Sequence, residues 1–599
     1  MGNLYTADLE TTTDENDCRV WAWSVCDIEN TDRVFFDNNI DSLIEFMKSE
    51  GNATFYFHNL KFDSDSIFIY LFEHNFKHVT RREDEETQTF TTLISDMGAF
   101  YSTKIIFEKK GKRTKYAQIY DSLKIIPFGV EQIAKAFGLP INKLELDYKS
   151  YRAPGHVLTE HEIQYITHDV KIVAMALKIL FDQGLTKMTQ GSNALHDYKN
   201  TVGLKNFTRW FPMPDELIDR DVRKSYRGGF TYLNPLYQEK DIGTGLVFDV
   251  NSLYPWVMHD CPLPYGEPVF FHGKYEQDDL YNLYVQCVYC QFELKPGHIP
   301  TIQLKNNLSF VPNQYLHSSN DEMVTMYLTS VDLELFLEHY DVFNLEYHGG
   351  WKFKSTTGLF SAYIDKWTKV KIDSKRTGNK GMYTLSKLML NALYGKYGLK
   401  MDVRSKIPYY NEGKISFTYG EKEKRKPVYI PVATFVTAWA RNKTIRSAQA
   451  LYDLFVYADT DSLHLSVNIP DELARMTPDE LEELTTADLQ RFGVPIPDEF
   501  IVDPFALGAW KLESKFNRAR FLRQKSYIED WNAPETWNNP ELYDPDLLNI
   551  TCAGMPKNCY QFVNWGNFRV GASYSGKLLP KHVKGGIVLK DTEFTIKRA

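Results

Sequence analysis

Several features common in large proteins are scarce in this 599-residue sequence. It has seven cysteines, an odd number spread thinly along the chain, which argues against a disulfide framework and favours a reducing, intracellular setting. No uninterrupted apolar run approaches the roughly 18 residues of a membrane span. The N-terminus, MGNLYTADLETTT, lacks the basic start and apolar stretch of a secretory signal. We therefore expect a cytoplasmic protein that is not secreted.

Positive charge is also in deficit, since 69 Lys and Arg face 78 Asp and Glu and leave a net charge of −9. Such a chain argues at first against a nucleic-acid partner, because that affinity rests on cations that neutralise phosphates. The distribution of basic residues along the chain removes this objection to a nucleic-acid partner. Residues 365–400, 511–525 and 553–599 hold nine, six and eight basic side chains against two, one and two acids. These segments are candidate phosphate-facing patches, and the aromatic content of 14% supplies rings for base stacking.

One CxxC spacing is present, formed by Cys287 and Cys290 within YVQCVYCQFEL. The stretch alternates like a strand, where a spacing of three puts the two side chains on opposite faces. A zinc site would need a second Cys or His pair nearby, which is missing. We therefore expect buried strand cysteines.

Local patterns predict a few elements that carry the argument, and no internal repeat or low-complexity tract is found. They are a strand over 4–9, a helix over 159–183 with a Thr159-x-x-Glu162 capping box, a buried strand over 246–250, a helix over 380–399 with Gly395 and Gly398 near its end, and a strand, turn and strand over 454–467. Residues 468–503 hold ten acids against two basic residues and predict a solvated helical insertion.

The first set of candidate acids lies in the N-terminal third. Asp8 and Glu10 are two apart on a predicted strand, so both side chains leave the same face. Asp63 follows the next strand, and Asp169 lies on the capped helix, four residues after Tyr165. Singly, each acid would more commonly be a surface or capping residue. Together they could hold two divalent cations for phosphodiester hydrolysis.

The second set follows much later in the chain. Asp249 ends a buried strand, and Asp459 and Asp461 sit in YADTDS at a predicted hairpin turn. Turns are rich in Asp for local hydrogen bonding. Here apolar strands flank the turn, so acids cost desolvation free energy unless a cation or a donor compensates. Oxygen-rich sites of this kind suit Mg²⁺.

The helix between these acids carries complementary charge. Lys387, Asn391 and Tyr394 are spaced i, i+4 and i+7 and are expected to share one face. An amphipathic helix with a solvated lysine would show the same spacing, although three leucines already supply its apolar face. The triad could present a cation to a triphosphate and a ring to a base.

Eight motifs, in this order, resemble those of the family B DNA polymerases of the protein-primed, phi-29 phage type. They are DLETTT (8–13), YFHNLKFD (56–63), YITHD (165–169), YRGG (226–229), DVNSLYP (249–255), KLMLNALYG (387–395), YADTDS (457–462) and KSY (525–527). The series spans almost the whole chain.

The resemblance implies an α/β and α+β multidomain fold, in which a ribonuclease H-like 3′–5′ exonuclease domain precedes a right-hand polymerase with two terminal-protein-region insertions. By this analogy the chain divides into the exonuclease domain (1–189), the first part of the palm (190–260), the first insertion (261–358), the fingers (359–398), the second insertion (399–431), the second part of the palm (432–552, including 468–503) and the thumb (553–599). The first insertion would contact a priming protein and the second would encircle DNA.

The resemblance also implies the catalytic and metal-binding residues. The exonuclease metals would be bound by Asp8, Glu10, Asp63 and Asp169, with Tyr165 orienting the attacking water and Lys143 close to the scissile phosphate. The polymerase metals would be bound by Asp249 and Asp461, supported by Asp459 and the carbonyl of Val250.

Substrate contacts are implied in the same way. The incoming triphosphate would meet Tyr254, Lys371, Lys387, Asn391 and Tyr394, with Tyr254 excluding a ribose 2′-hydroxyl. A frayed 3′ end would be held by Thr11, His58, Asn59, Phe62, Ser122 and Leu123, and duplex or template DNA by Tyr226, Gly228, Gly229, Ser252, Lys525 and Tyr527.

Three positions depart from the family pattern. Ala392 stands where Ser is common, and Tyr383 stands near where a basic fingers residue is often found, with Lys380 as the candidate substitute. His168, beside the metal-ligand candidate Asp169, is unusual and is expected to be exposed.

The implied function is a DNA-directed DNA polymerase that replicates a viral linear genome in the host cytoplasm by protein-primed initiation, with proofreading, processive synthesis and strand displacement. Its partners would be template-primer DNA, dNTPs and a terminal protein, without a membrane, as a monomer or a heterodimer with the terminal protein. Its cofactor would be Mg²⁺, two per active site, with Mn²⁺ as a substitute. One alternative is a processive polymerase that uses ordinary oligonucleotide primers only. Another is a catalytically silent DNA-binding replication factor, against which the presence of all seven carboxylates argues.

Overall fold

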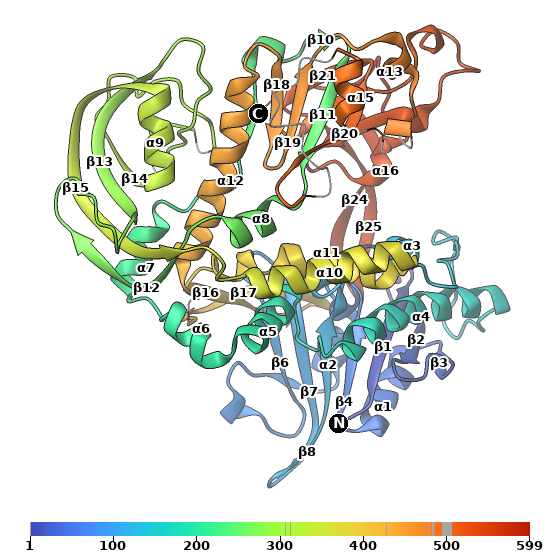
Figure 1. The fold of residues 1–599 in the computed structure, drawn as a ribbon. Coiled ribbons are helices and arrows are strands. Elements are labelled where there is room, and N and C mark those ends of the chain that lie inside the picture. The colour runs from blue at the N-terminus through green and yellow to red at the C-terminus, as the bar shows by residue number, and fades with distance from the viewer. Residues whose placement is uncertain are drawn as a thin grey trace.

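The computed structural model describes residues 2–305, 307–311, 313–426, 428–477, 480–481, 484, 486–493 and 506–598. An N-terminal lobe (blue and teal in Figure 1) lies opposite a larger lobe built from the middle and late parts of the chain. The paired helices α10 (Ser361–Thr377) and α11 (Lys380–Ala392) lie between the lobes. None of the described helices is long and apolar enough to cross a membrane.

The N-terminal lobe is built on an eight-stranded sheet with the order β3-β2-β1-β4-β8-β7-β6-β5. Its strands are β1 (Leu4–Thr11), β2 (Val20–Asp27), β3 (Val34–Asp37), β4 (Ala53–Phe57), β5 (Lys77–His78), β6 (Thr89–Ile94), β7 (Phe100–Lys110) and β8 (Arg113–Asp121). Its helices are α1 (Ile40–Glu50), α2 (Asp63–Glu73), α3 (Val130–Phe137) and α4 (Glu160–Asp182). β1, β4 and β8 are parallel neighbours, so their carboxyl ends meet at one edge of the sheet.

The predicted capping box is confirmed at the start of α4, where the Thr159 side chain accepts from the Glu162 N–H and the Glu162 carboxylate accepts from the Thr159 N–H. α4 packs against β1 and β2, and its buried face includes Tyr165 and Asp169. The cap therefore fixes where these two residues meet the sheet.

A five-stranded antiparallel sheet with the order β20-β11-β19-β18-β9 forms the centre of the second lobe. These strands are β9 (Thr231–Leu233), β11 (Gly245–Val250), β18 (Phe455–Asp459), β19 (Ser462–Ser466) and β20 (Trp510–Phe516). A four-stranded sheet beside it contains β10 (Asp241–Ile242), β21 (Arg518–Arg523), β22 (Ser526–Asp530) and β23 (Leu548–Cys552). The predicted buried strand at 246–250 and the strand, turn and strand at 454–467 are both confirmed.

The remaining elements surround these sheets. A curved sheet covered by α9 (Ser330–His339) contains β12 (Leu263–Phe271), β13 (Leu283–Leu294), β14 (Val324–Thr329) and β15 (Tyr340–Thr356). A separate hairpin is formed by β16 (Asp402–Asn411) and β17 (Lys414–Lys424). The other α-helices that bear on the sites are α5 (Gln190–Val202), α6 (Leu204–Trp210), α7 (Glu216–Arg223), α8 (Leu253–Asp260), α12 (Ile430–Ala450), α13 (Asp471–Arg475), α15 (Thr486–Arg491) and α16 (Lys557–Tyr560).

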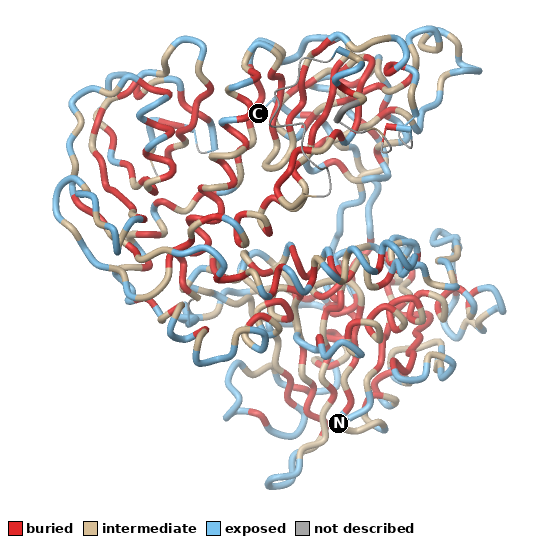
Figure 2. Tube along the Cα trace, viewed as in Figure 1, coloured by how far each residue is buried: buried red, intermediate tan, exposed pale blue. Residues whose placement is uncertain are grey.

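The C-terminal hairpin of β24 (Ser573–Val583) and β25 (Gly586–Thr595) crosses the space between the lobes, and Figure 2 shows it largely exposed there. Its tip docks on the N-terminal lobe, where His582 Nδ1 lies 2.6 Å from Oδ2 of the buried Asp65. The Gly585 N–H also donates to the Gly413 carbonyl in the β16–β17 turn, at 3.0 Å. A Cβ at Gly585 would lie 1.9 Å from the Cys18 carbonyl oxygen, so this close approach requires glycine.

Two predicted elements are corrected. The helix over 380–399 ends at Ala392, and the chain passes into a 3₁₀ turn at Tyr394–Lys396. Tyr394 therefore lies beyond the end of the α-helix that carries Lys387 and Asn391. The described part of the acidic stretch 468–503 contains the helices α13 and α15, but it is not simply solvated, because Leu473, Leu481 and Leu489 are buried in the main core. Within this stretch, residues 478–479, 482–483, 485 and 494–503 lie outside the described residues.

All seven cysteines are buried and free. Cys287 and Cys290 lie on β13, where Cys287 pairs with Tyr327 of β14 and Cys290 joins a separate apolar cluster under α9. The expectation of buried strand cysteines is confirmed.

Candidate active sites

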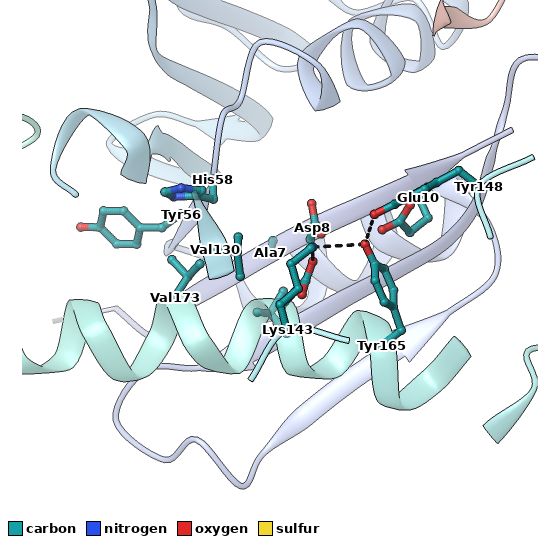
Figure 3. A pocket seen from close by; sticks show the side chains of 12 residues that line it. Ala7, Asp8, Glu10, Tyr56, His58, Val130, Lys143, Tyr148, Tyr165 and Val173 are labelled. Carbon is teal, nitrogen blue, oxygen red and sulfur yellow. Dashed lines mark hydrogen bonds and ion pairs between the residues drawn. The ribbon is translucent and has the colours of Figure 1, made fainter. Parts of the chain in front are cut away.

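The N-terminal acidic site, defined by Asp8, Glu10, Asp63 and Asp169, opens into a pocket of about 220 Å³ at the edge where β1 faces α4. Asp8 and Glu10 point into this pocket from β1, as Figure 3 shows. Asp63 begins α2 beside them, and Asp169 reaches the pocket from α4. Asp8, Glu10 and Asp169 therefore share one pocket, while Asp63 lies outside its lining, where burial and the nearby charges of Asp8 and Glu10 raise its pKa.

A lysine of the chain, Lys143, lies in this pocket. Lys143 Nζ forms an ion pair with Asp169 Oδ2 and donates to the Tyr165 hydroxyl at 3.2 Å (Figure 3). The Tyr165 hydroxyl is also hydrogen-bonded to that of Tyr148. The second oxygen of Asp169, Oδ1, is buried and has no hydrogen-bond partner. One carboxylate oxygen is thus neutralised by the chain itself, and the other is left for a ligand.

Burial and mutual repulsion disfavour the charged carboxylates. Burial, with Asp169 nearby, raises the pKa of Asp8 to about 7. Burial and the charges of neighbouring acids raise the pKa of Glu10 and of Asp63 well above their usual range. Burial also raises the pKa of Tyr165, so its hydroxyl keeps its proton. Such a cluster is stabilised by a bound cation.

Two of the predicted 3′-end residues, Asn59 and Leu123, are held by a carboxylate that no sequence motif indicates. Asp121 ends β8, is buried, and accepts from the backbone N–H groups of Asn59 and Leu123, both at 3.0 Å. His58 Nδ1 lies 3.0 Å from the Ser122 hydroxyl. Phe62 precedes α2 and is 37% exposed, as a ring that stacks on a base must be. Thr11 is the last residue of β1.

The central acidic site, defined by Asp249, Asp459 and Asp461, lies at one end of the five-stranded sheet. Asp249 and Asp459 both pair with Ser462 of β19, from its two sides, and the Val250 N–H donates to the Asp461 carbonyl at 2.8 Å. This register brings three acids together from residues more than two hundred positions apart. Asp459 is held by the Thr231 hydroxyl at 3.1 Å, the Tyr457 hydroxyl at 3.3 Å and Lys525 Nζ at 3.1 Å.

At the central site, as at the N-terminal site, burial raises the pKa values of the carboxyl groups. Burial, with Asp461 and Glu513 nearby, raises the pKa of Asp249 to about 8. Burial also raises the pKa of Asp461 to about 6, against an opposing backbone hydrogen bond. Lys387 and Lys511 act in the opposite sense on Asp249. The acids are therefore set within a basic surrounding.

Three backbone positions at the central site adopt the left-handed region. They are Ser252 (φ 55°), Thr460 (φ 61°) and Lys525 (φ 55°). Asn59, at the N-terminal site, does the same with φ 72°. Side chains other than Gly and Asn pay a conformational penalty there, and such residues cluster at functional sites.

The predicted triphosphate residues line the same end of the sheet. Lys371 Nζ donates to Asn251 Oδ1 and Ser252 Oγ, both at 3.4 Å. Burial and neighbouring lysines lower the pKa of Lys371, so an anion at this position would be favoured. The rings of Tyr254 and Tyr394 pack with centroids 4.3 Å apart.

Lys387 and Asn391 are exposed on α11, while its other face is buried. Lys380 lies elsewhere on the helix, with its aliphatic stem against Gly138 of the N-terminal lobe, 3.1 Å from the position of an added Cβ. The ring of Tyr383 lies under Lys387, with Nζ 5.6 Å from the centroid. His168 is partly exposed, and its Nδ1 lies 3.0 Å from the Asn142 carbonyl oxygen.

The YRGG segment contacts the hairpin turn directly. A Cβ at Gly229 would lie 2.5 Å from the Thr460 hydroxyl oxygen, and the Thr460 N–H donates to the Phe230 carbonyl at 2.6 Å. Tyr226 lies against Gly398, where an added Cβ would meet the Tyr226 hydroxyl at 2.5 Å. An added Cβ at Gly228 meets nothing within 4 Å.

Among the described residues, no three His, Cys, Asp or Glu side chains are already gathered closely enough to hold a metal ion.

The sequence reasoning also passed over Glu513 on β20. It is the extra residue in a β-bulge between the Val247–Ser514 and Phe248–Leu512 pairs, and its charge raises the pKa of both Asp249 and Asp461. A bulge leaves no sequence signal comparable to a motif.

Comparisons with known proteins agree with this arrangement. The family model for DNA polymerase type B, organellar and viral, matches residues 44–476. The DNA polymerase of Bacillus phage B103 is 46% identical over 602 aligned residues that cover 99% of each chain. That of Bacillus phage phi29 is 44% identical with the same coverage. The phi29 DNA polymerase complexed with primer-template DNA and incoming nucleotide substrates aligns over 100% of both chains, with a TM-score of 0.88 and 43% identity.

The chain therefore belongs to the type B DNA polymerases. Within that class it is a DNA-directed DNA polymerase of the phi29 phage type, and its fold is that of the phi29 enzyme over the full chain.

Proposed function

We propose that this DNA polymerase carries two separate reactions, with strand synthesis at the central acidic site and 3′–5′ trimming of primer ends at the N-terminal acidic site. The observation that carries the proposal is the pair of carboxylate clusters on two different sheets, each with pKa values raised by burial and each beside lysines. We assign residues 1–189 to the exonuclease domain, 190–260 and 432–552 to the palm, 359–398 to the fingers and 553–599 to the thumb.

Both donor sets fit divalent cations. Asp169 Oδ1 is buried and has no hydrogen-bond partner, and the pKa values of Asp8, Asp249 and Asp461 are raised. A nearby divalent cation would stabilise the charged form of each of these carboxylates. We assign Asp8, Glu10, Asp63 and Asp169 to one pair of Mg²⁺ ions, and Asp249, Asp461, Asp459 and the Val250 carbonyl to the other. When bound, such ions activate an attacking oxygen and stabilise the charge on the leaving oxygen.

In synthesis, Lys371 and Lys387 bind the phosphates of the incoming dNTP, because they form a cationic surface beside the central acids. Tyr394 packs on the nascent base pair, next to Asn391, and the Tyr254 ring excludes a 2′-hydroxyl. Lys525 and Tyr527 hold the primer terminus. Ser252 and the segment from Tyr226 to Gly229 hold the template. The phi29 enzyme, solved with primer-template DNA and incoming nucleotides, supports these substrate classes.

In trimming, Tyr165 orients water with a hydroxyl that remains protonated, and Lys143 stabilises charge near the scissile phosphate. The frayed strand is held by Thr11, His58, Asn59, Phe62, Ser122 and Leu123. The networks around Asp121 support a rigid cradle for that strand.

Initiation is proposed to use the hydroxyl of a terminal protein as primer, with the insertions at 261–358 and 399–431 serving the priming protein, processivity and strand displacement. The support is full-length similarity to the phi29-type enzymes. The alternative is extension of ordinary oligonucleotide primers only.

A double dissociation tests the two-site proposal. Asp461→Asn is expected to abolish primer extension and spare trimming of a single-stranded oligonucleotide, and Asp8→Asn is expected to do the reverse. Both reactions are measured in Mg²⁺ on one gel series, with thermal melting as the folding control. Loss of both activities in either folded variant would show that the two sites are not separate.

Protein priming is tested by covalent labelling. Mg²⁺, a labelled dNTP and a candidate priming protein are incubated with the wild type and with Asp461→Asn. A labelled protein band formed by the wild type alone supports protein priming, whereas extension of oligonucleotides without any protein label supports the alternative.

A further inference from the structure

A buried imidazole–carboxylate pair lies between the two sheets of the second lobe, outside all the motifs. His464 Nδ1 on β19 lies 2.6 Å from Glu529 Oε1 on β22, and the two side chains are 3% and 1% exposed. Because the carboxylate can only accept, the imidazole donates this hydrogen bond. The second oxygen of Glu529 accepts from Asn549 Nδ2 on β23 at 2.9 Å. A buried polar pair of this kind is costly unless its bonds are satisfied.

Three aromatic rings enclose His464. Its ring centroid lies 5.1 Å from that of Tyr527, 5.2 Å from that of Tyr457 and 5.5 Å from that of Phe521. The tyrosine rings also contact each other, with centroids 5.4 Å apart. The hydrogen bond to Glu529 fixes the plane of the imidazole, and the imidazole in turn limits where the tyrosine rings can lie.

One of these rings bears on the central acidic site. The Tyr457 hydroxyl accepts from the Lys525 backbone N–H at 3.0 Å and donates to Asp459 Oδ2 at 3.3 Å. Lys525 has a left-handed backbone with φ 55°, and its Nζ lies 3.1 Å from Asp459 Oδ1. The Tyr457 hydroxyl is therefore a direct link between an acid of the site and a strained lysine in the KSY segment.

We propose that His464 and Glu529 are positioning residues for DNA synthesis, which fix the rings of Tyr457 and Tyr527 and thereby place Lys525 at the primer terminus. This inference rests on the proposed contact of Lys525 and Tyr527 with the primer. Neither member of the pair touches the reacting atoms. Their effect passes through the Tyr457 hydroxyl and the Tyr527 ring.

The test compares Glu529→Met, which removes the acceptor, with Glu529→Gln, which keeps one. Glu529→Met is expected to lower the primer-extension rate at saturating dNTP by about tenfold. The reason is that it leaves the buried His464 donor without an acceptor, and the lost hydrogen bond has a free energy of that order. The dNTP KM and the trimming of single-stranded DNA are expected to stay unchanged. Glu529→Gln is expected to retain extension within about threefold, because His464 keeps its acceptor.

Asn549→Ala, at a partly exposed position, keeps the proposal testable if Glu529→Met fails to fold. Asn549→Ala should lower the primer-extension rate by roughly twofold to threefold and leave the dNTP KM and the trimming rate unchanged.

The matched control is His339→Leu against His464→Leu. His339 is also buried, at the end of α9, and its Nδ1 lies 2.7 Å from the Ile299 carbonyl oxygen, outside the two sheets that carry the acidic sites. Both variants are expected to lower the melting temperature, but only His464→Leu should lower extension on an oligonucleotide primer. Equal extension by the two variants, or a parallel loss of extension and trimming in His464→Leu, would overturn the inference.

Lys525→Ala separates this inference from the function on which it rests. Normal extension by Lys525→Ala would refute the primer-terminus assignment itself. Impaired extension by Lys525→Ala together with normal extension by His464→Leu would refute only the positioning role.

Discussion

The two acidic sites solve the same electrostatic problem differently. At the N-terminal site the chain supplies its own cation, because Lys143 is ion-paired with Asp169 inside the pocket. At the central site, within the described residues, no such ion pair is made by Asp249 or Asp461, and the nearby lysines act at longer range. The first site is partly neutralised at rest. At the second site Asp459 pairs with Lys525, at 3.1 Å, while the charges of Asp249 and Asp461 are balanced by described lysines only at longer range.

The difference extends to the backbone. Asp8 and Glu10 project from alternate positions of strand β1, whereas Asp459 and Asp461 flank the left-handed Thr460 in a tight turn. The central site therefore depends on a strained turn held from outside by Gly229 and Phe230. Substitutions distant from the acids should damage the central site more readily than the N-terminal site.

The largest expected effect concerns the built-in cation. Lys143→Met keeps the length of the side chain but removes its charge, and trimming of single-stranded DNA is expected to fall by about 100-fold, while primer extension stays unchanged. Lys149→Met, at an exposed lysine, is the control. Unchanged trimming by Lys143→Met would remove the distinction between the two sites.

The next effect concerns substrate choice at the central site. Tyr254→Val removes the ring that packs on Tyr394 and is expected to raise ribonucleotide incorporation relative to dNTP incorporation by on the order of tenfold or more. Tyr254→Phe keeps the ring and should retain discrimination. The measurement is single-nucleotide extension with each triphosphate. Equal discrimination by Tyr254→Val and the wild type would show that this ring does not contact the sugar.

A smaller effect tests the dependence on the strained turn. Gly229→Ala places a Cβ 2.5 Å from the Thr460 hydroxyl and is expected to lower extension by about tenfold through overpacking, with trimming unaffected. Gly228→Ala, which meets nothing within 4 Å, should have the smaller effect of the two. The reverse ranking would mean that the turn tolerates displacement.

The smallest effect is on stability. Burial raises the pKa values of Asp8 to about 7 and of Asp249 to about 8, so without metal the folded chain binds more protons than the unfolded chain between about pH 4 and pH 8. The folded chain is therefore most stable below the usual pKa of an aspartate, and its free energy of unfolding falls as the pH rises through the raised pKa values. In EDTA the melting temperature should therefore fall by roughly a few degrees from pH 5 to pH 8. Mg²⁺ should restore most stability at pH 8, and equal Mg²⁺ effects at both pH values would contradict this.

The sequence predicted those parts of the fold and the sites that local patterns determine. The capping box of α4, the buried strand before Asp249 and the hairpin around Asp459 and Asp461 follow from short-range preferences, and each is observed. The family motifs named residues whose side chains the fold then gathers, such as Asp8, Glu10 and Asp169 in one pocket.

What the sequence could not predict depends on tertiary contact. α11 ends at Ala392, where Tyr394 packs on Tyr254 of a distant segment, a contact that helical periodicity does not contain. Asp121 and Glu513 matter only because β8 ends beside β4 and because β20 bulges beside β11. The leucines of the acidic stretch are buried by a core that lies elsewhere in the sequence.

The docking of the C-terminal hairpin has a consequence for the order in which the protein is made. Asp65 meets His582 only after a further 517 residues have been added, a delay on the order of a minute at typical synthesis rates. Until then the surface of the N-terminal lobe around Cys18 and Asp65 has no cover from Gly585 and His582. The N-terminal lobe, which is made first, therefore gains these contacts only at the end of synthesis, and a chain that stops short of the hairpin would leave Asp65 without its imidazole partner.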